Sequence, residues 1–204
     1  MGDVHACADE LATLLDLVEP TTTVFVGDLF TKGPDPAAVF WLAHTHAAVL
    51  GNHDERLLAL LDGRRRDDPM GRAVIKRLDR AAPPWREWTR SLPLFHEVAG
   101  FTVVHAGLHP SGELPLTTRK MALIMRRYPM KDPEAPFWWQ QYTGERRVIF
   151  GHDAIRGLVR VEREGRPWLI GLDTGCCYGG ALSGYVVEED EIVQVPAAKR
   201  YWKP

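Results

Sequence analysis

Residues 47–63 read AAVLGNHDERLLALLDG and combine an apolar run, a polar tip and an amphipathic segment. The apolar run ends at Leu50, and the tip extends from Gly51 to Asp54. The segment that follows carries leucines at helical spacing and ends at Gly63, which is typical of a helix C-terminus. This stretch therefore predicts a buried strand, a polar loop and a helix, the repeating unit of an α/β fold.

The same pattern recurs on both sides of this stretch. GDVHA precedes a segment of helical periodicity at 8–18, and the β-branched run TTTVFVG at 21–27 leads into Asp28. Five polar tips follow apolar runs or begin such units: GDVH, GD, GNHD, HAG and GHD. Because the loops at the carboxyl ends of the strands of an open α/β sheet meet in one crevice, we expect one shared pocket. Its predicted members are Asp3, His5, Asp28, Asn52, His53, His105 and His152.

The length and composition of the chain fit one ordinary globular domain. The 204 residues can bury a sizeable core, so we expect a single domain over 1–204. Residues 64–92 are charged and interrupted by prolines, and we expect surface helices there that form a helical cap or insertion. Residues 181–202 predict a hairpin built around EEDE. The formal net charge of −2 gives no basic excess of the kind that wraps nucleic acid.

The cysteines and the N-terminus indicate the cellular compartment in which the protein is expected. Cys7 stands alone, and the adjacent Cys176 and Cys177 are poorly placed to bridge, so we expect no disulfide framework. No apolar run is long enough for a bilayer, and the N-terminus lacks the basic and apolar regions of a signal peptide. We therefore expect a cytoplasmic protein without a membrane partner.

The predicted pocket offers carboxylate, amide and imidazole ligands but no thiolate. Such a set suits Mn²⁺, Fe or Zn²⁺ better than a soft metal. Because the donors exceed the needs of one ion, we expect two divalent ions about 3.5 to 4 Å apart, bridged by the carboxylate of Asp28. Taken alone, a His or Asp beside glycine is more often a helix cap or a turn former. The metal prediction therefore depends on the recurrence of the pattern.

GDVHA, GDLFTKGP, GNHD, HAG and GHD, in this order, resemble the calcineurin-like metallophosphoesterases of the phosphoprotein phosphatase superfamily over nearly the whole chain. GNHDERL and LDTGCCYGGALSG are most similar to the branch that contains bacterial symmetrical diadenosine tetraphosphatase and the ApaH-like phosphatases. The resemblance implies an α/β fold with a two-sheet β-sandwich flanked by helices. It also implies two divalent metal ions, with Mn favoured and Fe, Zn, Co, Ni or Mg as alternatives.

The resemblance also assigns roles to the predicted pocket residues. Asp3 and His5 would bind the first ion, Asn52, His105 and His152 the second, and Asp28 would bridge the two. His53 would act as general acid, while a hydroxide that bridges the ions attacks phosphorus in line.

Cationic side chains are expected to bind the substrate phosphate. Lys32 lies where protein phosphatases have the arginine of GDxxDRG, and it offers a point charge instead of a bidentate fork. A second contact is expected between the HAG and GHD blocks, where MRRY supplies Arg126 or Arg127. A solvated helix face is an equally good interpretation of this arginine pair.

Three positions depart from the protein phosphatase pattern. Thr31 takes the place of the aspartate that pairs with the catalytic histidine, so His53 is expected to lack an orienting carboxylate. Asp54 stands where many relatives have glutamate, and Ala6 stands where the usual block has glycine. The first two departures favour a nucleotide substrate over a phosphoprotein.

The leading hypothesis is a metal-dependent phosphohydrolase that cleaves phosphoanhydride or phosphoester bonds of dinucleoside polyphosphates, with capped RNA as a further nucleotide substrate. A serine/threonine or tyrosine phosphoprotein phosphatase is the alternative, and a non-catalytic metal-binding or nucleotide-binding module is the second alternative. Trp138 and Trp139 in FWWQQY could stack on a base, but core packing is the favoured interpretation.

Only Met1 and Gly2 precede Asp3. Relatives have a strand before GDVH, so we expect that the first strand is missing, with either a natural start upstream of Met1 or a sheet that is closed in another way. In either case Asp3 lies close to a charged terminus, which we expect to weaken its metal site.

Overall fold

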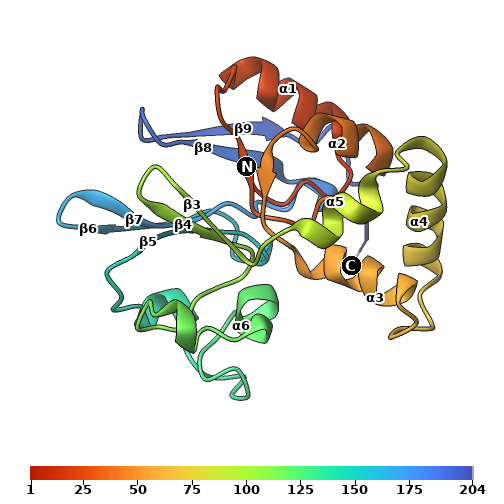
Figure 1. The fold of residues 1–204 in the computed structure, drawn as a ribbon. Helices are drawn as coiled ribbons and strands as arrows, with labels where there is room; N and C mark the ends of the chain where they lie inside the picture. Colours follow the sequence, from red (N-terminus) through yellow and green to blue (C-terminus); the bar gives the residue numbers. More distant parts are fainter. Residues whose placement is uncertain (204) are drawn as a thin grey trace.

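The computed structural model describes residues 1–203 and contains a five-stranded sheet stacked against a second layer of strands, with helices outside (Figure 1). In the five-stranded sheet, β4, β5 and β7 pair in parallel, and β3 and β6 lie antiparallel at its edges. The parallel strands end at one edge, where the HAG, GHD and DTG segments follow. In sheet order the strands are β3 (Phe95–Val98), β4 (Phe101–Val104), β5 (Arg147–Phe150), β7 (Arg166–Gly171) and β6 (Val159–Arg163).

The second layer is built from two pairs of strands. β1 (Val24–Phe25) pairs in parallel with β2 (Ala47–Ala48), and β8 (Ala181–Val186) forms the predicted antiparallel hairpin with β9 (Glu191–Pro196).

The first two residues join these pairs. The Val26 N–H donates to the Met1 carbonyl (3.0 Å), and the Gly2 N–H donates to the Ser183 carbonyl (2.8 Å). No strand is assigned to residues 1–4, yet this backbone lies between β1 and β8. It occupies the strand position that we expected to be missing.

The core between the two layers consists of aliphatic and aromatic side chains from both. All of its central members are buried, and the partly buried Val24 and Tyr185 close its margins. This packing confirms the predicted two-sheet sandwich. The central members are Val26, Val49, Phe101, Val103, Ile149, Ile170 and Leu172.

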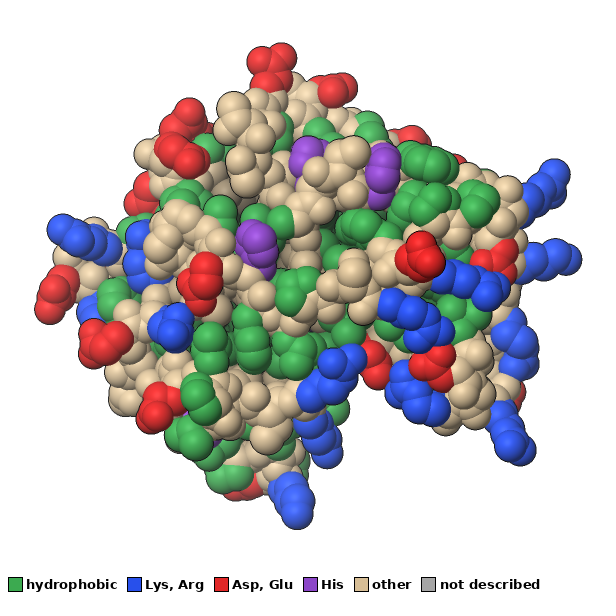
Figure 2. Space-filling model, viewed as in Figure 1, with side chains coloured by type: hydrophobic (Ala, Val, Ile, Leu, Met, Phe, Trp, Pro, Cys, Tyr) green, Lys and Arg blue, Asp and Glu red, His purple; other side chains and the backbone are tan. Residues whose placement is uncertain are grey.

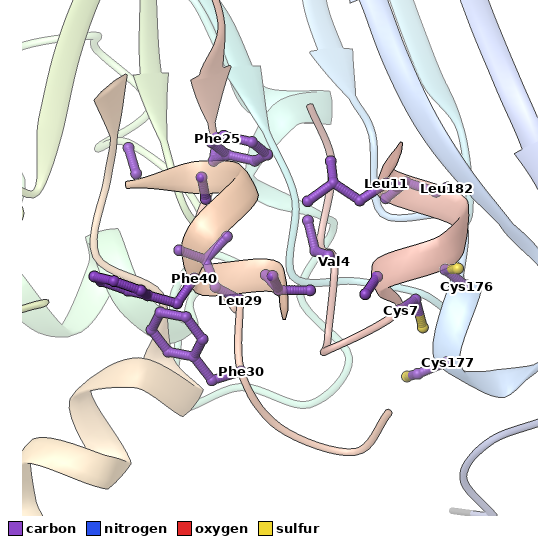
Figure 3. Close-up of a cluster of buried hydrophobic side chains, with 14 of the residues drawn as sticks. Val4, Cys7, Leu11, Phe25, Leu29, Phe30, Phe40, Cys176, Cys177 and Leu182 are labelled. Carbon is purple, nitrogen blue, oxygen red and sulfur yellow. The ribbon is translucent and has the colours of Figure 1, made fainter. Parts of the chain in front are cut away.

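Helices cover the outer face of the second layer. α1 packs on β8, β9 and α2, and α2 packs in turn on α4. Figure 3 shows the buried side chains between these elements, which include Phe25, Phe30 and Phe40. The helices of this group are α1 (Ala8–Val18), α2 (Pro36–Ala43), α3 (Asn52–Leu61), α4 (Pro69–Ala81) and α5 (Trp85–Ser91).

Residues 64–92 contain α4 and α5, in a stretch where helices were predicted. Leu78 and Trp85 are fully buried, and the Trp85 ring meets the ring of Phe30 edge-on at 6.2 Å. One face of these two helices therefore contributes to the core beside the loop that carries Asp28.

The outer face of the five-stranded sheet is covered by residues 108–142, which include α6 (Arg119–Ile124). Trp138 is 1% exposed and packs edge-on against Tyr142 and Phe150, so it belongs to the core as favoured.

Within residues 1–203, no helix combines the length with the hydropathy that a membrane-spanning segment needs.

The structure differs from the predicted elements in a few places. α3 begins at Asn52, so Asn52 and His53 lie in the first helical turn and not in a loop. β3, β6 and α6 were not predicted. α6 has only six residues, and β3 and β6 lie at the edges of the sheet. β6 alternates Val159 and Val161 with the charged Arg160 and Glu162, so it lacks the apolar run that marked the central strands.

Candidate metal centre

The predicted ligands come together from five separate segments of the chain. Asp3 lies in the N-terminal segment and His5 directly after it, and Asp28 follows β1. The remaining members follow β2, β4 and β5. A pocket of about 450 Å³ is lined by Asp3, His5, Asp28, Asn52, His53 and His152, together with Lys32, Arg126, Ala154, Ile155, Asp173 and Tyr178.

Asp28 lies between two of the histidines. Its Oδ2 is 3.5 Å from the Nε2 of His5, and its Oδ1 is 3.5 Å from the Nε2 of His105. Ligand atoms of Asp3, Asp28 and His105 all lie within 4.8 Å of one another. The carboxylate of Asp28 therefore faces both groups of predicted ligands at once.

The Oδ1 of Asn52 and the Nε2 of His105 are both hydrogen-bond acceptors, and they face each other. The Nδ1 of His105 lies 2.8 Å from the carbonyl oxygen of Val26, which can only accept, so Nδ1 carries the proton and Nε2 has a free lone pair. This Nε2 is 2.8 Å from the Oδ1 of Asn52, and the Nδ1 of His152 is 3.0 Å from the same oxygen. A cation bound by these atoms would relieve the repulsion between the lone pairs of His105 and Asn52.

The electrostatics of the pocket also suit cations. Burial raises the pKa of Asp28 to about 6 and the pKa of Asp173 to about 6. Burial, followed by the neighbouring carboxylates of Asp173 and Asp28, holds the pKa of Asp3 well above its usual value. Burial lowers the pKa of His105 to about 4, so this imidazole is neutral. Acidic groups crowded together beside neutral imidazoles form a donor set that fits first-row divalent ions.

The tips of the loops have an unusual backbone conformation. His5, Asp28 and His152 have φ angles of 46°, 54° and 73°, and Ala6 and Lys32 have φ angles of 60° and 72°. These values lie in the left-handed region, which costs non-glycine residues on the order of 1 kcal/mol or more each. The surrounding structure holds the ligands in this conformation, as is common at functional sites.

Two glycines allow close approach to the aspartates. A Cβ atom on Gly151 would lie 1.9 Å from the Oδ1 of Asp3, and one on Gly51 would lie 2.1 Å from the amide nitrogen of Asp28. Neither position leaves room for a side chain. This explains why glycine precedes the ligands in GNHD and GHD.

Thr31 connects two histidines of the site. Its hydroxyl oxygen is 3.2 Å from the Nδ1 of His5 and 3.1 Å from the Nδ1 of His53, and Thr31 is fully buried. The backbone N–H of His53 donates to the Oδ1 of Asp28 (2.8 Å). Burial, followed by the charge of Lys32, lowers the pKa of His53 to about 3. The missing carboxylate is thus replaced by a hydroxyl that orients both rings.

The predicted cationic residues separate into two groups. The Nζ of Lys32 is 3.0 Å from the Nε2 of His5 and 5.2 Å from the ring centre of Tyr178, inside the pocket. Arg126 lines the same pocket, and its Nη2 lies 3.4 Å from the carbonyl of His152. Arg127 does not line this pocket; it donates to the carbonyl of Ala135 and belongs to the neighbouring hollow.

Three further residues shape the site without having been predicted as members. The carboxylate of Asp54 accepts hydrogen bonds from the backbone N–H groups of Asp28 (2.8 Å), Leu29 (3.0 Å) and Gly51 (3.3 Å). It connects the Asp28 loop to α3. Its position in the GNHD block is the sequence feature that could have identified it as part of the site. Asp173 closes a turn by accepting from the Gly175 N–H (3.1 Å), and it faces the pocket.

Tyr178 is the third such residue, and nothing in the sequence pattern indicated it.

The molecular surface around the site is uneven. Figure 2 shows a notch between the α6 region and the α3–α4 region, with Lys and Arg side chains on both of its sides.

Comparison with known proteins identifies the family. Residues 1–192 match the family model of the calcineurin-like phosphoesterases. A symmetrical bis(5'-nucleosyl)-tetraphosphatase of Vibrio cholerae serotype O1 is 36% identical over 90% of this chain and 92% of its own length. Its counterpart from Bordetella pertussis is 28% identical over 100% of this chain and 96% of its own length.

A solved structure supports the same assignment. A crystal structure provisionally named a diadenosine tetraphosphatase is 31% identical, with a TM-score of 0.78 over 96% of this chain and 91% of its own. The match with the family model covers nearly the whole chain and includes every predicted ligand. This chain therefore belongs to the calcineurin-like phosphoesterase family and is an enzyme of the hydrolase class.

Proposed function

We propose that this enzyme hydrolyses dinucleoside polyphosphates at a centre of two divalent cations. The observation that carries the proposal is the position of Asp28 between His5 and His105, with both distances at 3.5 Å. The choice of a nucleotide substrate is supported by relatives that are themselves named bis(5'-nucleosyl)-tetraphosphatases.

The ligands divide into two groups around Asp28. Asp3 and His5 would hold one ion, and Asn52, His105 and His152 would hold the other, with Asp28 shared. When bound, such cations would make water a nucleophile near neutral pH and neutralise charge on the phosphoryl oxygens. Lys32 and Arg126, which line the pocket, would orient the phosphate groups.

Thr31 would fix the proton positions on two histidines. If the Nε2 of His5 binds a cation, the ring keeps its proton on Nδ1. This N–H then donates a hydrogen bond to the Thr31 hydroxyl oxygen. The hydroxyl then donates its own hydrogen to the Nδ1 of His53, so that neutral His53 holds its proton on Nε2. His53 could donate this hydrogen in a hydrogen bond to the leaving oxygen as negative charge develops there, and the proton that the product finally carries would come from solvent. Thr31 is a positioning residue in this scheme, in the place of a carboxylate.

Thr31→Val tests this arrangement. We expect kcat to fall by about 10- to 100-fold, which is at or below the lower end of the roughly 100- to 10,000-fold contribution of general acid catalysis, because Thr31 acts only through His53. The loss should be larger for an alkyl phosphate than for p-nitrophenyl phosphate, because nitrophenolate leaves without a proton. Thr23→Val is the matched control, since Thr23 is also buried but its hydroxyl has no hydrogen-bond partner among residues 1–203. Equal losses for both leaving groups would remove Thr31 from the proton path.

The substrate class is tested on the Mn²⁺-loaded enzyme. We expect kcat/KM for diadenosine tetraphosphate to exceed the values for phosphoserine and phosphotyrosine peptides by more than about 100-fold, because a substrate that leaves polar groups of the site unpaired can be disfavoured by more than this. Chromatography of the products distinguishes two molecules of ADP from ATP plus AMP. A preference for either peptide would favour the phosphoprotein phosphatase alternative and end the nucleotide proposal. The family description and the names of the matched relatives are those of enzymes, which argues against the non-catalytic binding module.

A further inference from the structure

A second hollow adjoins the metal pocket. It has a volume of about 390 Å³ and shares Arg126 and Ile155 with the metal pocket, so the two are continuous. We call it the arginine groove. The residues that define it here are Ile124, Arg126, Arg127, Phe137, Ile155 and Arg156.

The charge of the arginine groove favours an anion. Three guanidinium groups face two carboxylates, those of Asp132 and Asp153. Asp153 is 3.6 Å from Arg126, which leaves Arg127 and Arg156 without a carboxylate partner among the described residues. Guanidinium groups bind phosphate oxygens in a bidentate fashion. Two of them are therefore available for phosphate.

The groove also offers planar and apolar surface. The guanidinium carbons of Arg127 and Arg156 each lie 4.4 Å from the ring centre of Phe137. The ring of Trp139 stacks on Phe137 at 5.6 Å with an interplanar angle of 9°. Guanidinium planes and aromatic rings are the surfaces on which bases stack.

Ile155 stands at the junction of the two hollows. It is 83% exposed, and Ile124 is 41% exposed in the groove itself. Covering a β-branched aliphatic side chain of this exposure removes apolar surface from water, which favours binding of the ligand. Cations, a planar stack and exposed aliphatic groups together match a nucleoside with phosphates attached, whereas an inorganic ion would use the cations alone.

We propose that the arginine groove binds the distal nucleoside phosphate of a dinucleoside polyphosphate, whose phosphate chain runs from the metal pocket past Arg126. This inference rests on the proposed function and specifies where the second nucleoside lies. Each hollow has the volume of an ordinary ligand site, so one end of the substrate can occupy each.

The test uses Phe137→Ala and Arg156→Ala in the full chain, with Arg80→Ala on the exposed side of α4 as the control. We expect both groove variants to raise KM for diadenosine tetraphosphate about 10-fold, the effect of losing one stacking partner. kcat and the kinetics on p-nitrophenyl phosphate should not change, because neither Phe137 nor Arg156 lines the metal pocket. Arg156 is exposed, so its variant remains informative if Phe137→Ala folds poorly.

The possible failures can be told apart. If the wild type cleaves the dinucleotide and the variants keep its KM, the groove proposal is wrong while the proposed function stands. If the wild type does not cleave the dinucleotide, the proposed substrate is wrong, and the groove is judged by titration calorimetry with ADP. Binding of ADP that is tighter than that of inorganic phosphate and weakened by Phe137→Ala would support the groove; equal binding by all variants would overturn it.

Discussion

Asp28→Asn is expected to remove both cations and to lower kcat/KM by more than about 100-fold, the upper range for losing a group that only supports a metal ligand. The substitution preserves the shape of the side chain but removes its charge and one of its two acceptor oxygens. Those oxygens lie 3.5 Å from His5 and from His105, so neither group of ligands keeps its share of the carboxylate. Metal content by mass spectrometry and steady-state kinetics measure the two effects.

The fold should survive this change. Burial raises the pKa of Asp28 to about 6, which means that its charge is unfavourable in the metal-free protein. We therefore expect Asp28→Asn to leave the metal-free Tm unchanged or slightly higher, and to abolish the rise in Tm that added Mn²⁺ produces. Asp35→Asn is the control, because Asp35 caps α2 outside the pocket and asparagine caps equally well. Full metal content and turnover in Asp28→Asn would contradict the bridging role.

Gly151→Ala is expected to displace Asp3 and to reduce activity by about 100-fold, as a shift of 1 Å at a catalytic group can. The added methyl group would lie 1.9 Å from the Oδ1 of Asp3 and 2.7 Å from a methyl group of Val26, so the carboxylate or the strand must move. The hydrogen bonds from the His152 N–H to Asp3, both 3.2 Å, would be disturbed in the same step. Metal content should fall towards one ion per chain.

Gly165→Ala is the control for a general effect of alanine at glycine. Gly165 lies in the turn between β6 and β7, has a φ of 72° and has open space around it. Its substitution should cost about 1 kcal/mol of stability through backbone strain and leave metal content and kcat unchanged. If Gly151→Ala behaved in the same way, the close packing of Gly151 on Asp3 would not matter for the metal centre.

Much of the central fold could be predicted because the central strands carry a strong apolar signal. The runs before HAG and GHD are buried on both faces, so they are continuous apolar segments, and each is followed by glycine or a polar residue. The edge strands β3 and β6 have no such signal, because one side of each faces solvent. The pairing of Met1 and Gly2 with β1 and β8 depends on backbone hydrogen bonds between distant segments, which no local pattern encodes.

The candidate site was predictable in its membership but not in its connections. Polar tips at strand ends identified the ligands, because the topology of an α/β sheet brings such tips together. The sequence could not show that Thr31 reaches two imidazoles, since this depends on side-chain distances. It also could not distinguish Arg126 from Arg127, because adjacent residues after α6 point in different directions and only the first faces the pocket.

The left-handed backbone at the loop tips has a consequence for divergence in this lineage. Ala6 and Lys32 share that conformation with the ligands although neither is among the predicted metal ligands. Glycine, asparagine and aspartate adopt the left-handed backbone conformation most easily. The backbone shape alone therefore favours substitutions to these residues at both positions. A narrow residue repertoire at such positions would then reflect the geometry of the chain, and it would persist in descendants that had lost all catalytic activity.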